Sequence, residues 1–295
     1  MEKPEDATKP KSDMNKFLVS ADFKESVKVV TEKEKAELKV LGIELDWLLK
    51  NEVHPVLDGV RETLQECYDC LPFHGTAEKS AQQDMQAQRI LLTCPNASSI
   101  NFKSVVTLTG DCVEEADLQF KHKQGKEHHL FRTKVKQGCV WRLPQIRDAG
   151  NHLCSALEIA SRNDSTYQYK SVKEVFLQLD ELMDSLMKCR QCLSLPKRKS
   201  IQDLMDSQKT LQFKPPLPND VAISFYIHTS KLVLALYFLQ TNGQHHRVEI
   251  THRVQVEAMV KWLNEAIIFF TLSLQQCQQL KDKLMAVSKI IEEQQ

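Results

Sequence analysis

An apolar repeat near the carboxyl terminus constrains the fold more than any other part of the sequence. In and around WLNEAIIFFTLSLQQCQQLKDKL at 262–284, apolar residues recur at alternating steps of four and three, the heptad spacing of a helix that packs one seam against another helix. The seam contains Val256, Val260, Leu263, Ile267, Phe270, Leu274, Cys277 and Leu284, and it continues to Val287 and Ile291. A helix over 256–291 is about 54 Å long, so the sequence predicts an elongated molecule.

The same stretch does not resemble a membrane span. Asn264, Glu265, Lys281 and Asp282 interrupt it, and lipid accepts such side chains only with partners. The longest uninterrupted apolar run, LVLALYFL at 232–239, is shorter than the roughly 18 residues that a spanning helix needs. The sequence therefore predicts no integral membrane segment.

The sequence favours a protein of the cytosol, with a nuclear pool possible, and without catalytic function. The amino terminus is charged from its second residue and lacks the apolar core of a secretory signal, so the nine cysteines are expected to be reduced. The 39 basic and 39 acidic side chains leave no net charge, which argues against a nucleic-acid partner. The glycines form no phosphate-binding or nucleophile motif, and no HExxH is present. We expect no enzyme, no cofactor and no catalytic residue.

A second helical stripe lies near the amino terminus. Its apolar residues, again at steps of four and three, are Leu49, Val53, Val56, Val60, Leu64, Cys67 and Leu71. The helix is predicted to begin near Thr31, with Glu34 completing a capping box, and to end at LPFHG. Residues 1–30 mix charged side chains with few large apolar ones, which predicts a flexible charged extension.

The period of the apolar pattern then changes along the chain. Short β-branched or aromatic segments separated by turn signals predict an antiparallel meander, and they lie at 89–94, 102–109, 116–121 and 129–136. Helical patterns follow at 144–162 and 171–193, the second of which opens on a Ser and Glu pair typical of a capping box. After KPPLPND, the segments VAISFYIH, KLVLALYFL and RVEITH predict three further strands.

This order of elements predicts an α+β fold in two parts, each discontinuous in sequence. Residues 31–71, 143–193 and 254–293 are expected to form an antiparallel, leucine-zipper-like helical bundle. Residues 86–142 and 214–253 are expected to form one smaller antiparallel sheet, because neither block alone closes a good core. Residues 194–213 are the connector.

The seam leaves two oligomeric states open. It can be buried within a monomer or paired with a second chain, and bulky Phe269 and Phe270 together with the other helices favour the monomer over the homodimer. Trp47, Trp141 and Trp262 are candidate interface anchors. Trp47 and Trp262 flank helical stripes, so we expect both to pack in the core.

Two CxxC pairs raise the question of a zinc site. Cys67 with Cys70, and Cys189 with Cys192, lie at i and i+3 on one helix face, and four converging thiolates would suit a tetrahedral Zn²⁺. Cys67 also belongs to the apolar stripe, where a cysteine acts as a small apolar residue. We favour the packing role and predict no metal site.

The basic run KRK at 197–199 has three interpretations. It can be a nuclear import signal, part of a basophilic kinase site acting on Ser200, or a solvated linker. The solvated linker is the interpretation that we favour.

Six segments closely resemble the Rogdi family, the so-called atypical leucine-zipper proteins. They run in the same order from about residue 40 to 285. The segments are WLLKNEVHPVL at 47–57, VVTLTGDCVEEADLQFK at 105–121, WRLPQIRDAGNH at 141–152, TYQYK at 166–170, LPNDVAISFYIHTSKL at 217–232 and WLNEAIIFFTLSLQQCQQLKDK at 262–283. The last segment is the most specific.

The resemblance implies both a fold and a function. Rogdi proteins have an elongated fold with a helical bundle joined to a β subdomain, and they are the animal counterpart of the small second subunit of the fungal RAVE complex. The implied function is that of a non-catalytic adaptor. It promotes assembly of the vacuolar proton ATPase with rabconnectin-type β-propeller scaffold proteins, which recruit it to acidic vesicle membranes. The alternative is a homodimeric helical scaffold in vesicle trafficking or nuclear regulation, unrelated to the proton pump.

Overall fold

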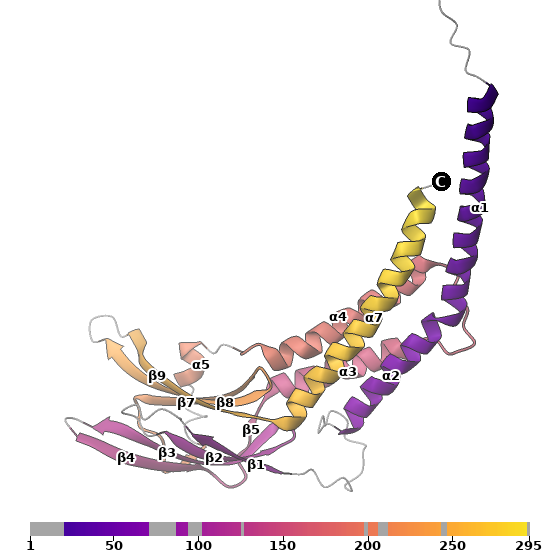
Figure 1. Ribbon diagram of the computed structural model, residues 1–295. Coiled ribbons are helices and arrows are strands. Elements are labelled where there is room, and N and C mark those ends of the chain that lie inside the picture. The colour runs from indigo at the N-terminus through magenta and orange to yellow at the C-terminus, as the bar shows by residue number, and fades with distance from the viewer. Residues whose placement is uncertain are drawn as a thin grey trace, which may run out of the picture.

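The computed structural model describes residues 21–70, 87–93, 102–124, 127–197, 200–205, 212–242 and 247–293. These residues form helices and antiparallel sheets, which confirms the α+β class. The helices run together as a long limb, and the sheets lie at one end of it, so that the described part of the molecule is curved and extended (Figure 1).

Five long helices build the limb. They are α1 (Ala21–Asn51), α2 (Val53–Cys70), α3 (Pro144–Ala160), α4 (Val172–Ser194) and α7 (Lys261–Glu293). Helix α3 packs along α4, α7 lies against both α2 and α4, and α1 contacts α7 and α2. Segments far apart in the sequence therefore share one helical core.

Local chemistry explains where α3 and α4 begin. Pro144 lies in the first turn of α3, where its missing N–H removes no helical hydrogen bond. At the start of α4, the Oγ of Ser171 accepts a hydrogen bond from the backbone N–H of Glu174 at 3.3 Å. The Glu174 carboxylate accepts one from the N–H of Lys170 at 3.0 Å, so the expected Ser and Glu pair does cap this helix.

The predicted beginning of the first helix is wrong. Helix α1 begins at Ala21, and Thr31 and Glu34 lie inside it. Of the predicted extension, 21–30 are helical and 1–20 lie outside the described residues. Lysine and glutamate favour a helix interior even where few apolar residues accompany them, so a low apolar content did not exclude a helix over 21–30.

The predicted single helix over 31–71 is also divided. Helix α1 ends at Asn51 and α2 begins at Val53. Backbone hydrogen bonds continue through the junction, because the N–H of Glu52 donates to Leu48 at 3.0 Å and the N–H of Val56 donates to Glu52 at 3.2 Å. The two helices are thus joined without a loop.

The strands form two antiparallel sheets. The first contains β1 (Gln88–Thr93), β2 (Lys103–Thr109), β3 (Cys112–Gln124), β4 (Glu127–Val135), β5 (Trp141–Arg142) and β6 (Phe213–Lys214). Its order is β1-β2-β3-β4-β6, and β5 pairs with β3. The second sheet has the order β7-β8-β9, with β7 (Val221–His228), β8 (Lys231–Asn242) and β9 (Arg247–Met259).

The prediction that both strand blocks form one sheet is therefore wrong. The sheets lie face to face (Figure 1) and share one apolar cluster, to which Phe120 of β3 and Leu234 of β8 both belong. Trp141 of β5 meets Phe225 of β7 edge to face, with ring centroids 5.6 Å apart. The first block supplies most of one layer of this core and β7, β8 and β9 of the second block supply the other, so a common core did not require a common sheet.

The boundary between β9 and α7 corrects the predicted carboxyl-terminal helix. Strand β9 continues to Met259, and α7 begins at Lys261 rather than at 254–256. Val256 therefore lies in the sheet, where it pairs with Leu234. Val260 lies at the junction, and both valines are buried.

Gln145 joins the helices to the second sheet. Its side-chain amide donates to the carbonyl oxygens of Leu195 at 2.7 Å, Ile227 at 2.8 Å and Cys192 at 3.1 Å. Its carbonyl oxygen accepts from the N–H of Ile227 at 2.8 Å. One buried side chain thus satisfies backbone groups at the end of α4 and in β7, which is how polar groups persist in a core.

Candidate interaction site

The seam residues of α2 and α7 lie inside the helical limb. Eight have no exposed surface, namely Val53, Val60, Leu64, Cys67, Leu263, Phe270, Cys277 and Leu284. Leu49 of α1 and Leu274 of α7 are buried as well, while Val56 and Ile267 are half-buried and pack on the same cluster. The residues that the heptad pattern marks therefore meet helices of the same chain.

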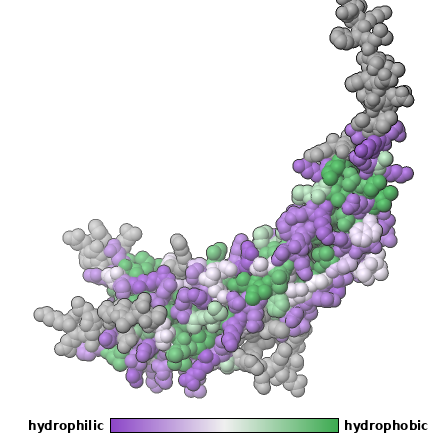
Figure 2. Space-filling view, in the orientation of Figure 1, coloured by the Kyte–Doolittle hydropathy of each residue, from purple (hydrophilic) through white to green (hydrophobic). Residues whose placement is uncertain are grey.

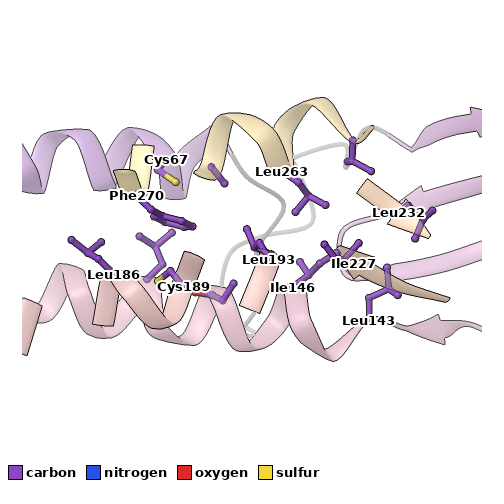
Figure 3. Close-up of a cluster of buried hydrophobic side chains, with 14 of the residues drawn as sticks. Cys67, Leu143, Ile146, Leu186, Cys189, Leu193, Ile227, Leu232, Leu263 and Phe270 are labelled. Atoms are coloured by element: carbon purple, nitrogen blue, oxygen red, sulfur yellow. Dashed lines mark hydrogen bonds between the residues drawn. The ribbon is translucent and has the colours of Figure 1, made fainter. Parts of the chain in front are cut away.

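The close-up of this core shows how the helices meet. Phe270 of α7 lies near Cys67 of α2 and faces Leu186 and Cys189 of α4 (Figure 3). All four side chains are completely buried. Full burial of a side chain such as Phe270 contributes about 1.5–3 kcal/mol, and such a residue is not available to a second protein.

The cysteines of the CxxC pairs act as apolar residues where the structure describes them. Burial raises the pKa of Cys189, and its Sγ donates to the carbonyl oxygen of Ala149 at 3.6 Å. Burial likewise raises the pKa of Cys192.

The side chain of Cys70 lies outside the described residues, so the structure does not describe the four CxxC cysteines together. Within the described ranges, no group of three or more His, Cys, Asp and Glu side chains could hold a metal ion. In the same ranges, no helix combines the length and apolarity that a membrane crossing requires.

The expectation that Trp47 packs in the core is wrong. Trp47 is 53% exposed on α1, whereas Trp141 is buried and Trp262 is half-buried against the common cluster. Ile43 and Val40 precede it by four and seven residues and are 63% and 62% exposed. We call Val40, Ile43 and Trp47 the α1 ridge.

The α1 ridge lies on the side of α1 that faces away from the other helices. Leu41 and Leu45 are half-buried and Leu48 is buried, and they form the stripe with which α1 contacts α7 and α2. With 3.6 residues per turn, the α1 ridge is on the opposite side of the helix from this stripe. A surface helix normally carries one apolar stripe, so the second one makes the α1 ridge a candidate docking surface.

Apolar side chains also gather where α1 runs beside the end of α7 in the space-filling view (Figure 2). A contiguous exposed apolar surface of this kind typically marks a protein interaction site. Tryptophan is among the residues that most often carry the binding energy of such sites. The sequence signal was present, because 40, 43 and 47 follow helical spacing, but the predicted stripe began only at Leu49.

The α3–α4 turn contains TYQYK at 166–170, one of the six segments quoted above. The Tyr167 hydroxyl donates to the Glu174 carboxylate, and this bond lowers the pKa of Glu174. The Tyr169 hydroxyl donates to Oε1 of Gln178 at 2.9 Å. Nε2 of His54 lies 2.6 Å from the carbonyl oxygen of Tyr167. These contacts attach the turn to α2 and α4 and give the segment a structural role.

Comparison with known proteins identifies the family. A family model described as "Rogdi leucine zipper containing protein" matches residues 44–247, which is more than half of the chain. This chain belongs to the Rogdi family. The Rogdi protein of Drosophila melanogaster is 33% identical over 262 residues, which cover 89% of this chain and 94% of the relative.

Rogdi homologues from other animals also match this chain. The human Rogdi homologue is 34% identical over 279 residues, which cover 86% of this chain and 94% of the homologue. The Caenorhabditis elegans homologue is 26% identical over 209 residues, which cover 65% of this chain and 70% of the homologue. The resemblance found in the sequence is therefore confirmed, and it extends over most of the Rogdi chain.

Proposed function

We propose that this chain is a non-catalytic adaptor in a RAVE-like complex that promotes assembly of the vacuolar proton ATPase. Its partners in this proposal are rabconnectin-type β-propeller scaffold proteins and ATPase subunits, and the chain reaches acidic vesicle membranes from the cytoplasm through them. The α1 ridge carries the proposal, because it is an exposed apolar stripe on a helix whose other side is already packed. Membership of the Rogdi family directs it towards this complex.

The helical limb suits such an adaptor mechanically. An assembly factor acts by binding one conformation of its client more tightly than another. Helices held by a buried seam present their outer side chains with little further loss of conformational entropy on binding. The α1 ridge is exposed in the free chain, so docking on it requires no opening of the seam.

Charges beside the α1 ridge are arranged to orient a partner. Lys39 and Glu44 lie next to Val40 and Ile43 and are exposed, and Lys50 pairs with Asp46 at 2.6 Å. Mixed charges around an apolar centre add specificity and register more than affinity. The expected partner surface is therefore an apolar patch flanked by charges of both signs.

The test is an affinity purification from cytosol with quantitative mass spectrometry. The wild-type chain is compared with an Ile43→Glu, Trp47→Glu double variant and with Leu177→Glu, a matched control at a 67% exposed leucine of α4. We expect the wild type and the control to enrich a rabconnectin-type scaffold and proton-ATPase subunits. The double variant should lose at least about tenfold of this enrichment, because two central anchors together exceed 1.4 kcal/mol.

Each other outcome has a definite meaning. If the folded wild type enriches neither the scaffold nor ATPase subunits, the adaptor function is wrong. If all three proteins enrich them equally, the function stands and the docking surface is elsewhere. If the wild type captures only itself and light scattering shows a dimer that the double variant lacks, the homodimeric scaffold replaces the proposal.

A further inference from the structure

A short helix in the connector covers the outer face of the second sheet. Helix α5 (Ile201–Met205) contacts β7 and β9, the strands on either side of β8. It lies on the face that points away from the first sheet (Figure 1). Leu204 of α5 is buried, and this face of the sheet carries the buried cluster of Tyr226, Val233 and Ala235.

One serine holds the amino-terminal end of α5. The Ser200 Oγ–H donates to Oδ2 of Asp203 at 2.8 Å, and the same Oγ accepts from the N–H of Asp203 at 3.2 Å. The N–H of Ser200 also donates to that Oδ2, at 3.0 Å. Reciprocal bonds of this kind fix the first turn of a helix. In a helix of only five residues, they are a large part of what holds it in place.

The sequence around Ser200 has the chemistry that basophilic kinases recognise. Lys197, Arg198 and Lys199 precede the serine, and Ile201 follows it. Ser200 is exposed, and Ile201 is 38% exposed. The side chains of Arg198 and Lys199 lie outside the described residues, but consecutive basic residues suit an acidic substrate groove by charge complementarity.

We propose that Ser200 is a phosphorylation site and that its modification releases α5 from the outer face of the second sheet. The co-substrates are ATP and a basophilic serine kinase. The Ser200 Oγ attacks the γ-phosphorus, an Oγ–P bond forms, the bond between the γ-phosphorus and the β,γ-bridging oxygen breaks, and ADP leaves. The hydroxyl proton passes to the catalytic carboxylate of the kinase.

The modified serine cannot keep the hydrogen bond that its hydroxyl donates to Asp203. Its oxygen has lost the proton that it donated to Oδ2, and a phosphate of nearly two negative charges now lies beside the Asp203 carboxylate. A phosphate at a helix amino terminus also gains from the helix dipole. That gain is small in a five-residue helix, and the carboxylate three residues on opposes it, so we expect disruption to dominate.

The surroundings allow α5 to move without loss of the core. A cavity of about 530 Å³ lies beside it, lined by residues that include Trp141, Arg142, Lys197, Asp203 and Tyr226. Leu204 belongs to neither of the two apolar clusters that the described residues form. Release of α5 therefore uncovers the face around Tyr226 and leaves the core between the sheets intact.

The first experiment tests the modification. The full chain is incubated with ATP and the catalytic subunit of cyclic-AMP-dependent protein kinase, and phosphopeptides are quantified by mass spectrometry. We expect Ser200 to be modified at least about tenfold faster than Ser171, a second capping serine that follows a single lysine, because more basic residues strengthen binding to an acidic groove. A Ser200→Ala variant should lose the signal. No phosphate on Ser200 of the folded chain, whether or not a 195–205 peptide is modified, would overturn the proposal.

The second experiment tests the release. Hydrogen–deuterium exchange of α5 should become at least about threefold faster after full phosphorylation, because its amides lose their protection. Binding of the dye ANS should rise as the apolar face is uncovered. In an Asp203→Asn variant, phosphorylation should change exchange less, because the like-charge repulsion is absent. Unchanged exchange in the fully phosphorylated wild type would show that Ser200 is not a switch for α5.

Discussion

Helices α7 and α1 carry apolar residues at the same spacing and use them in opposite ways. In α7, Leu263, Phe270 and Leu284 are completely buried against helices of the same chain. In α1, Ile43 and Trp47 are more than half exposed. Both sets satisfy the same helical period, so spacing alone does not distinguish a core seam from a docking surface.

The difference lies in the number of neighbours around each helix. Within the described residues, helix α7 contacts α2, α4 and α1, whereas the helices that α1 contacts closely are α7 and α2. The packed side of α1 therefore accounts for one stripe and leaves the α1 ridge uncovered. An apolar stripe on a helix identifies a contact, and only the arrangement of helices shows whether the contact is within the chain.

The variant with the largest expected effect on stability is Phe270→Ala. Because Phe270 is completely buried, we expect a loss of about 3–5 kcal/mol in the free energy of unfolding, from lost burial and the cavity that remains. Ile268→Ala, two residues away and 50% exposed, is the matched control and should stay within about 0.5 kcal/mol. Urea denaturation measures both. Equal losses for the two variants would mean that α7 does not have one buried and one exposed side.

Gln145 extends the comparison to a buried site that no apolar spacing marks. Gln145→Leu should cost about 2–3 kcal/mol in the free energy of unfolding, because the N–H and carbonyl groups of Ile227 lose their side-chain partner within the core. Gln191→Leu, on an exposed position of α4, should cost less than about 0.5 kcal/mol. If denaturant titrations show no loss in the free energy of unfolding for Gln145→Leu, the contact between the helices and the second sheet does not depend on this amide.

The sequence predicted some boundaries well because local chemistry determines them. Pro144 and Ser171 fix the beginnings of α3 and α4, and β7 spans the predicted segment 221–228. The segment around Val256 was ambiguous. Val254, Val256, Ala258 and Val260 alternate at steps of two, as in a strand, while 256–277 also fit steps of four and three.

Pairing decided that case, because Val256 lies opposite Leu234 and Ala258 opposite Leu232 in the second sheet. The division of the strands into two layers was likewise outside the reach of periodicity, which shows the face of a strand but not the sheet that it joins. The exposure of Trp47 depends on how many helices pack around α1. That arrangement cannot be predicted from the sequence of α1 alone.

The buried seam also predicts a dependence on alkaline pH. Burial raises the pKa of Cys277 from its ordinary value of 9.0 to about 12. Below pH 9 the thiol is protonated in both states; above it, the unfolded thiol ionises while the folded one does not, so stability falls as pH rises from about 9 to 12. At about pH 10 this one group should lower the free energy of unfolding by roughly 1.4 kcal/mol.

Cys277→Ala should reduce that slope, although the variant starts from a lower stability at neutral pH because of its cavity. Ile268→Ala removes no titratable group and should keep the wild-type slope. Thermal unfolding at a series of pH values distinguishes them. An unchanged slope in Cys277→Ala would mean that this buried thiol does not contribute to the alkaline loss.

The smallest effect on stability, and the one that separates the two kinds of stripe, is expected at Trp47. Trp47→Ala removes an exposed side chain, so the free energy of unfolding should change by no more than about 0.5 kcal/mol. Capture of the scaffold partner should nevertheless fall about tenfold or more, because a tryptophan anchor typically contributes at least about 2 kcal/mol to binding. Leu177→Ala, also exposed, should leave both quantities unchanged. If Trp47→Ala instead lowers stability as Phe270→Ala does, the α1 ridge is part of the fold and is covered by the chain itself.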